Sequence, residues 1–113
     1  MNVQFKKGVL TLCVLVLAAR KDRYGYELVK AISDKFVISE GTVYPLLRRL
    51  TKEEFVSTYI AESQEGPARK YYKLTEKGRL YLKEQLSEWR AFSDGVNRII
   101  EEGLGDDEKR FFD

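Results

Sequence analysis

The chain has 113 residues, 43% of them hydrophobic, which fits one globular domain with an appended element, and its single cysteine, Cys13, excludes an internal disulfide. It contains no histidine, so His-based triads and the commonest zinc ligand are excluded, and we expect neither an enzyme nor a metal or cofactor. The net charge of +2 divides into +5 over residues 1–73 (13 basic, 8 acidic) and −3 over residues 74–113 (7 basic, 10 acidic). The basic first part would attract a polyanion. The alternative is that both parts are ordinary solvated surfaces.

An apolar run from Val9 to Ala19 follows Lys6 and Lys7, and this arrangement resembles a short signal peptide. The run is too short to span a membrane, which takes about 20 apolar residues. Its removal would also strip a small domain of much of its core. We therefore expect a buried first helix over residues 4–19 and no membrane association, with a buried strand as the structural alternative.

A charged loop is predicted at residues 20–23, followed by a second helix over residues 24–35. Four apolar residues have the spacing of one buried helix face: Leu28, Val29, Ile32 and Phe36. A short link through residues 37–38 then leads to a third helix.

The third helix is predicted within residues 39–52, where an apolar stripe has i, i+3, i+4 and i+7 spacing: Val43, Leu46, Leu47 and Leu50. The remaining positions hold Gly, Thr, Tyr and Arg, which suit a DNA groove because Arg pairs with guanine and Thr and Tyr reach phosphates. A solvated amphipathic helix is the alternative. The start of this helix is open, since Thr42 as N-cap would leave Pro45 in the first turn, whereas Ser39 would place it in the interior.

Two strands are predicted within residues 55–74, around a loop at residues 62–68 with Gly66 and Pro67 as turn residues. Arg69 and Lys70 would stand at the tip. Because two strands alone are marginal in water, the hairpin must pack on the helices. A helix with a basic outer face followed by a hairpin with a basic tip is the layout of a winged helix-turn-helix.

Thr75 as N-cap and Glu76 in the first turn open a last helix that runs to about residue 102. A heptad-like apolar seam follows this helix: Leu82, Leu86, Trp89, Phe92, Val96 and Ile99. Such a seam packs on another helix, and a second copy of the chain is the simplest partner, with the first helix as the alternative. Residues 103–113 are expected to form a mobile acidic tail.

Four segments of the chain are similar to the PadR family of bacterial transcriptional regulators: residues 5–10, 24–28, 41–50 and 66–78. They occur in the family's order and spacing. The resemblance implies that the first run is a helix, that the last helix dimerises, and that the protein represses by binding an inverted repeat. Some members release DNA when a small aromatic compound binds, and in some short members a tryptophan lines the dimer cavity at the position that Trp89 matches.

We therefore predict a mostly α fold with a small β-hairpin, divided into a winged helix-turn-helix domain (1–74), a dimerisation helix (75–102) and a tail (103–113). The predicted protein is a cytoplasmic homodimeric repressor that binds near-palindromic double-stranded DNA and is released by a small aromatic effector at Trp89. The residues expected to touch DNA are Lys7, Tyr24, Thr42, Tyr44, Arg48, Arg49, Pro67, Arg69 and Lys70. The alternatives are a protein-binding winged helix and a small-molecule sensor without specific DNA binding.

Overall fold

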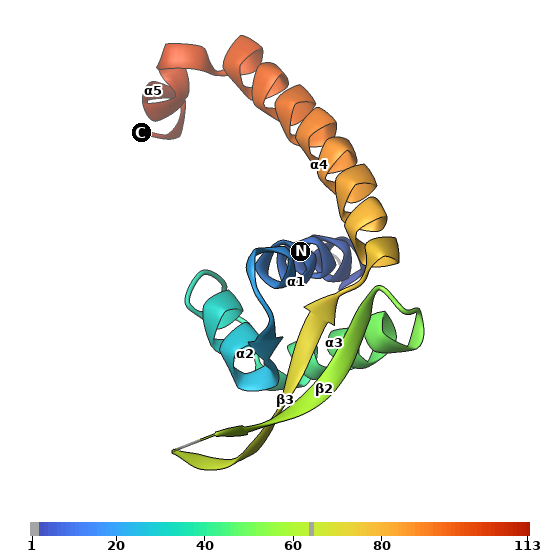
Figure 1. Ribbon diagram of the computed structural model, residues 1–113. Helices are drawn as coiled ribbons and strands as arrows, with labels where there is room; N and C mark the ends of the chain where they lie inside the picture. Colours follow the sequence, from blue (N-terminus) through green and yellow to red (C-terminus); the bar gives the residue numbers. More distant parts are fainter. Residues whose placement is uncertain (1–2, 64) are drawn as a thin grey trace. The chain divides into compact units, whose positions relative to one another are not determined.

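A computed structural model describes residues 3–63 and 65–113, and most of them are helical (Figure 1). The helices are α1 (Val3–Arg20), α2 (Gly25–Ser33), α3 (Glu40–Lys52), α4 (Glu76–Gly103) and α5 (Glu108–Phe112), with a 3-10 turn η1 (Gly105–Asp107). The strands are β1 (Arg23–Tyr24), β2 (Val56–Ser63) and β3 (Gly66–Leu74). The chain divides into two compact units, Met1–Lys83 and Glu84–Asp113.

The apolar run near the N-terminus is a buried helix, as predicted, and not a strand. Within α1, Leu10, Val14, Leu15 and Ala18 are buried. Cys13 is half-buried, and this burial raises the pKa of its thiol, which favours the uncharged form. In the part of the chain that the structure describes, no helix combines the length and apolarity that a membrane crossing requires.

The sheet has three antiparallel strands in the order β1-β3-β2, one more than the predicted hairpin (Figure 1). The prediction of a loop over residues 62–68 is wrong, because Ser63 pairs with Gly66 and Pro67 therefore belongs to β3. Gln64, which falls in that predicted loop, lies outside the described residues. The missed strand β1 consists of two residues that pair with Tyr72 and Tyr71, a contact that local sequence patterns do not reveal.

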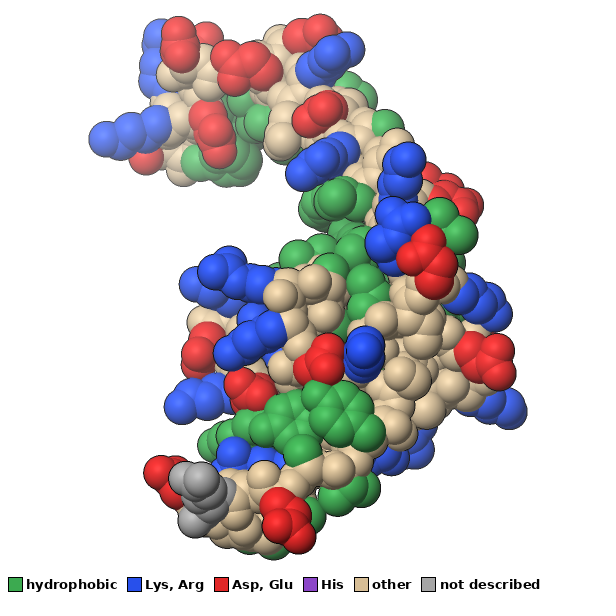
Figure 2. Space-filling model, viewed as in Figure 1, with side chains coloured by type: hydrophobic (Ala, Val, Ile, Leu, Met, Phe, Trp, Pro, Cys, Tyr) green, Lys and Arg blue, Asp and Glu red, His purple; other side chains and the backbone are tan. Residues whose placement is uncertain are grey.

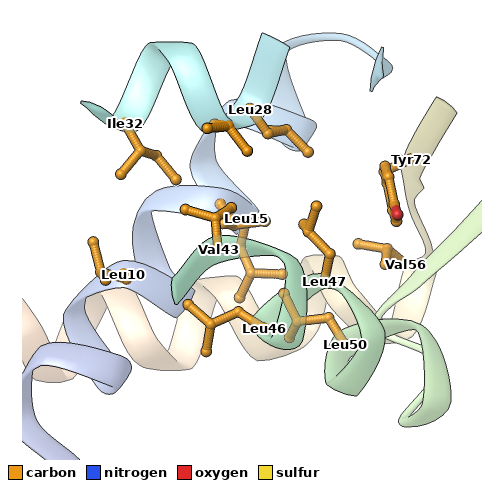
Figure 3. Close-up of a cluster of buried hydrophobic side chains, with 12 residues drawn as sticks. Leu10, Leu15, Leu28, Ile32, Val43, Leu46, Leu47, Leu50, Val56 and Tyr72 are labelled. Carbon is orange, nitrogen blue, oxygen red and sulfur yellow. The ribbon is translucent and has the colours of Figure 1, made fainter. Parts of the chain in front are cut away.

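The core of the first unit is built around the inner stripe of α3 (Figure 3). All four predicted stripe residues are buried, and they meet Leu10 and Leu15 of α1, Leu28 and Ile32 of α2, and Val56 and Tyr72 of the sheet. The prediction that Phe36 shares the buried face of α2 is wrong. That helix ends at Ser33, so Phe36 lies in the following turn with 41% of its surface exposed.

The C-terminal segment contains regular structure, namely η1 and α5. Phe111 and Phe112 contact each other edge to face, with ring centroids 5.0 Å apart, and both side chains are largely exposed. The mobility of residues 103–113 stays a prediction.

Candidate nucleic-acid interface

The start of α3 is settled in favour of Ser39. Its backbone is extended, with φ −96° and ψ 160°, and its carbonyl accepts the Thr42 amide at 3.0 Å. Pro45 therefore lies inside the helix. In a regular helix the amide of residue 45 would donate to the Gly41 carbonyl, and proline has no such hydrogen. The first turns of α3 are thus less tied by hydrogen bonds than the rest of the helix.

One flank of α3 faces α1 and forms a basic hollow, which we call the α1 flank. The hollow measures about 410 Å³ and is lined by Lys6, Lys7, Gly41, Thr42, Pro45, Leu46 and Arg49. The structure thus brings together Lys7, Thr42 and Arg49, three of the residues that the sequence predicted to touch DNA. Lys6 was missed, although it adjoins Lys7 in the sequence.

Arg49 is anchored to α1 through a buried hydroxyl group. Its Nη2 donates to Thr11 Oγ1 at 2.9 Å, and Thr11 Oγ1 donates to the Lys7 carbonyl at 2.8 Å. Thr11 is only 3% exposed, so this chain of hydrogen bonds satisfies a polar group inside the core. Thr11 was not singled out from the sequence, yet a threonine within an apolar run is a visible signal. Arg49 consequently holds α3 to α1 in addition to carrying charge.

The other flank of α3 faces the β2–β3 hairpin, the wing. Tyr44 and Arg48 of α3 and Lys70 of β3 lie near Tyr72 there, and we call this surface the wing flank. The Lys70 ammonium lies 5.8 Å from the centre of the Tyr72 ring. Burial raises the pKa of the Tyr72 hydroxyl, the neighbouring Tyr44 acts in the same direction, and the cation of Arg48 acts against it. Side chains from α3 and from β3 therefore converge on one basic surface.

The sheet face opposite the core carries a group of tyrosines, and Figure 2 shows hydrophobic side chains gathered over the sheet. The rings of Tyr59 and Tyr71 stack with centroids 5.4 Å apart, and Tyr24 meets Tyr71 edge to face at 5.7 Å. The Arg69 guanidinium lies 4.3 Å from the centre of the Tyr24 ring. A hydrogen bond of 2.7 Å to Asp22 raises the pKa of the Tyr59 hydroxyl.

The sheet places Arg69 and Lys70, two of the hairpin residues predicted to touch DNA, on opposite faces. Successive side chains of a strand point to opposite faces, so Arg69 lies on the tyrosine face and Lys70 on the face of α3. The prediction that both stand at the hairpin tip is wrong, because they pair with Ala61 and Ile60, away from the Ser63–Gly66 end. Pro67 is exposed close to that end. The part of Tyr24, Pro67 and Arg69 in DNA binding stays a prediction.

The basic side chains of both flanks are not neutralised by ion pairs. Across residues 3–63 and 65–113, the one ion pair joins Arg79 to Glu76, 2.6 Å apart on the surface of α4. The same residues contain no cluster of three or more acidic or cysteine side chains arranged to hold a metal ion. The surface formed by α3, the start of α1 and β3 carries the basic side chains of Lys6, Lys7, Arg48, Arg49 and Lys70, and such a concentration of positive charge attracts anions.

Comparison with known proteins identifies this arrangement. Residues 14–84 match the transcriptional regulator PadR-like family. The chain belongs to this family. A PadR-like transcriptional regulator from Bacillus cereus is 38% identical, with a TM-score of 0.79 over 87% of this chain and 97% of that one. A Streptococcus transcriptional regulator is 37% identical, with a TM-score of 0.79 over 87% and 98% of the two chains. Transcriptional regulator YqjI of Escherichia coli is 36% identical over 71% of this chain and 39% of its own length.

The family match and the similar structures confirm two predictions from the sequence. These are membership of the PadR family and the fold class, a winged helix-turn-helix with a long C-terminal helix. The winged helix consists of α1–α3 and the three-stranded sheet, with α3 in the place of the recognition helix and the β2–β3 hairpin as the wing.

The predicted seam on α4 is largely exposed. Trp89, Phe92, Val96 and Ile99 have exposed fractions between 36% and 72%. Trp89 and Phe92 have ring centroids 6.5 Å apart. Leu82 differs from these residues, because it packs partly against the core of its own chain. Large apolar side chains at these positions form an extended apolar surface, which is unusual for a monomer in water.

We predict that Arg49 and Thr11 are energetically coupled. In a double-mutant cycle of Arg49→Ala and Thr11→Val, urea denaturation should give a coupling of about 1 kcal/mol, the typical net value of one hydrogen bond. The matched control is a cycle of Arg48→Ala with Thr11→Val, because Arg48 faces the other flank. Equal coupling in the two cycles would contradict the anchoring role of Arg49.

Proposed function

We propose that the protein is a transcriptional repressor that binds a near-palindromic promoter site as a homodimer. The observation that carries this proposal is the convergence of Arg48, Tyr44 and Lys70 from two elements on one surface without acidic partners. A groove-reading helix beside a basic wing can contact base edges and backbone of the same duplex.

In the proposed complex α3 enters the major groove with its outer face. Arg48 is the best candidate for base readout, since its guanidinium presents paired donors that match the O6 and N7 acceptors of guanine. Tyr44 and Thr42 are suited to phosphate contacts through their hydroxyls. Lys7 of the α1 flank and Lys70 of the wing flank add charge on both sides of the helix. Arg49 contributes charge while it stays anchored to Thr11.

The apolar surface of α4 supports a second copy of the chain as the partner. Trp89, Phe92, Val96 and Ile99 recur at intervals of three and four residues, which places them on one side of a helix. A two-fold axis would bring the same seam of two chains together. Two recognition helices would then read half-sites about 34 Å apart, so the operator should be a near-palindrome. Occupation of the promoter, without any chemistry, would block transcription.

The first prediction of this proposal concerns Arg48. Fluorescence anisotropy with DNA from upstream of the protein's own gene, in the presence of excess competitor DNA, should show saturable binding that weakens as salt is raised. Arg48→Ala should weaken this binding by about tenfold or more, the value of one bidentate base contact.

The matched control is Arg98→Ala, which removes an exposed arginine from α4 and should leave the affinity unchanged. Unchanged affinity of the Arg48→Ala protein would remove α3 from its assigned role. Binding that competitor DNA abolishes would reduce the interface to a nonspecific basic surface.

The second prediction concerns the seam. Val96→Asp and Trp89→Asp each place a charge in the proposed dimer core, where an unpaired charge is strongly unfavourable, so both proteins should sediment as monomers. Ser87→Asp adds the same charge on another side of α4 and should remain dimeric. Dimers in all three variants would mean that the second copy binds elsewhere.

The third prediction concerns a small aromatic effector at Trp89. Because this is the sole tryptophan of the sequence, fluorescence excited beyond the absorption band of the seven tyrosines reports on it alone. We expect some planar aromatic amines or acids to quench this fluorescence and to weaken operator binding over the same concentration range. Quenching without any change in DNA affinity would favour a sensor whose ligand does not control DNA, and no quenching by any compound would remove the effector from the proposal.

A further inference from the structure

The C-terminal end of α3 leads directly into a tight turn at residues 53–55. The Glu53 amide donates to the Arg49 carbonyl at 2.9 Å, and the Phe55 amide donates to the Leu50 carbonyl at 3.0 Å. Glu54 has φ +64°, in the left-handed region that residues other than glycine rarely adopt. The chain therefore leaves α3 in a defined direction, one turn after the arginines of the interface.

Thr75, which precedes α4, and Lys77 in its first turn bind the three carbonyl groups of the turn at residues 53–55. Lys77 Nζ donates to the Glu53 carbonyl at 2.9 Å. Thr75 Oγ1 lies 2.7 Å from the Glu54 carbonyl oxygen and 3.0 Å from that of Phe55, and its single hydrogen can serve either. The Thr75 amide donates to the Phe55 carbonyl as well, at 3.2 Å. The end of α3 is thus tied to α4 by backbone acceptors as well as by core packing.

Gly78 allows the two elements to approach this closely. A Cβ atom at this position would lie 2.0 Å from the Phe55 carbonyl oxygen and 2.9 Å from its carbon. Its amide donates to Thr75 Oγ1 at 2.9 Å, so the same hydroxyl caps α4. The rings of Phe55 and Tyr81 also stack between the two elements, with centroids 4.1 Å apart and an interplanar angle of 10°.

We infer that this contact, the α3–α4 joint (residues 53–55 with Thr75, Lys77, Gly78 and Tyr81), positions the recognition helix for DNA, and that Thr75 and Gly78 are its positioning residues. The inference rests on the proposed DNA-binding dimer. Beyond the joint, α4 continues as one helix to Gly103 and carries the seam proposed to bind the second copy. The joint therefore connects the helix that reads the groove to the helix that dimerises.

This role predicts an effect on the spacing of half-sites, not on base contacts. A dimer must place two recognition helices in successive major grooves, and one base pair more or less changes both their distance and their phase around the duplex. A loosened or displaced joint should relax or shift the preferred spacing. It should leave the binding of a single half-site intact, because no side chain that touches DNA is removed.

The experiment compares wild type, Thr75→Val and Gly78→Ala on the operator identified through the upstream DNA. Fluorescence anisotropy is measured on duplexes whose two half-sites are separated by the native spacing and by one base pair more or less, and on a single half-site. Thr75→Ser keeps the hydroxyl, and Gly103→Ala adds a methyl group to the same helix where nothing lies within 4 Å. Sedimentation checks that every variant is dimeric.

We expect wild type and both control variants to prefer the native spacing. In Thr75→Val and Gly78→Ala, the ratio of the affinities for the native and the altered spacing should fall about fivefold, the factor that corresponds to one hydrogen bond. Alternatively, these variants should prefer another spacing. If Gly78→Ala does not fold, the comparison of Thr75→Val with Thr75→Ser decides.

Two outcomes overturn the inference while the proposed function stands. One is a wild-type spacing profile in folded Thr75→Val and Gly78→Ala dimers. The other is an equal loss on every duplex, including the single half-site, which would reduce the joint to fold stability. A wild-type protein that binds none of the duplexes would instead show that the proposed function itself has failed.

Discussion

The placement of the α3 side chains on the proposed DNA-binding surface depends on the burial of the inner stripe of α3. Val43, Leu47 and Leu50 are fully buried and Leu46 is 4% exposed. Full burial of such a side chain contributes about 1.5–3 kcal/mol, so rotating α3 by one residue about its axis would cost several kcal/mol. The core therefore determines which residues form the outer face. Arg48 points outward because the burial of Leu47 and Leu50 fixes the rotation of the helix about its axis.

Two adjacent arginines acquire different environments from this geometry. Successive residues of a helix are about 100° apart, so Arg48 lies toward the wing and Arg49 toward α1. Arg49 has a fixed hydrogen-bond partner 38 residues earlier in the chain, whereas the positive charge of Arg48 acts to lower the pKa of the buried Tyr72 hydroxyl. Both contribute to the long-range attraction of an anion. In the proposed complex the hydrogen bond to Thr11 holds an Nη2 donor of Arg49 on the α1 side, which favours Arg48 for the bidentate contact with a guanine.

The sequence predicted those helices and strands whose apolar residues recur with a regular spacing along the chain. The stripe of α3, the long helix α4 and the β-type runs after Phe55 all follow from spacing within a short window. Contacts between distant residues were not predicted in this way. Strand β1 exists only because Tyr24 pairs with Tyr71, and the extension of the hairpin to Ser63 and Gly66 depends on its pairing register. For α1, the resemblance to the PadR family decided between helix and strand, because Val and Leu run through it without clear periodicity.

The close approach at Gly78 has a consequence for how the protein tolerates change. Glycine within a helix costs about 1 kcal/mol relative to alanine, so selection for stability of an isolated α4 would replace it. The carbonyl of Phe55 leaves no room for a methyl group, so glycine occupies position 78 despite its cost to helix stability. In a saturation mutagenesis screen, position 78 would therefore score as intolerant as a ligand-binding residue, although its side chain is a single hydrogen that binds nothing.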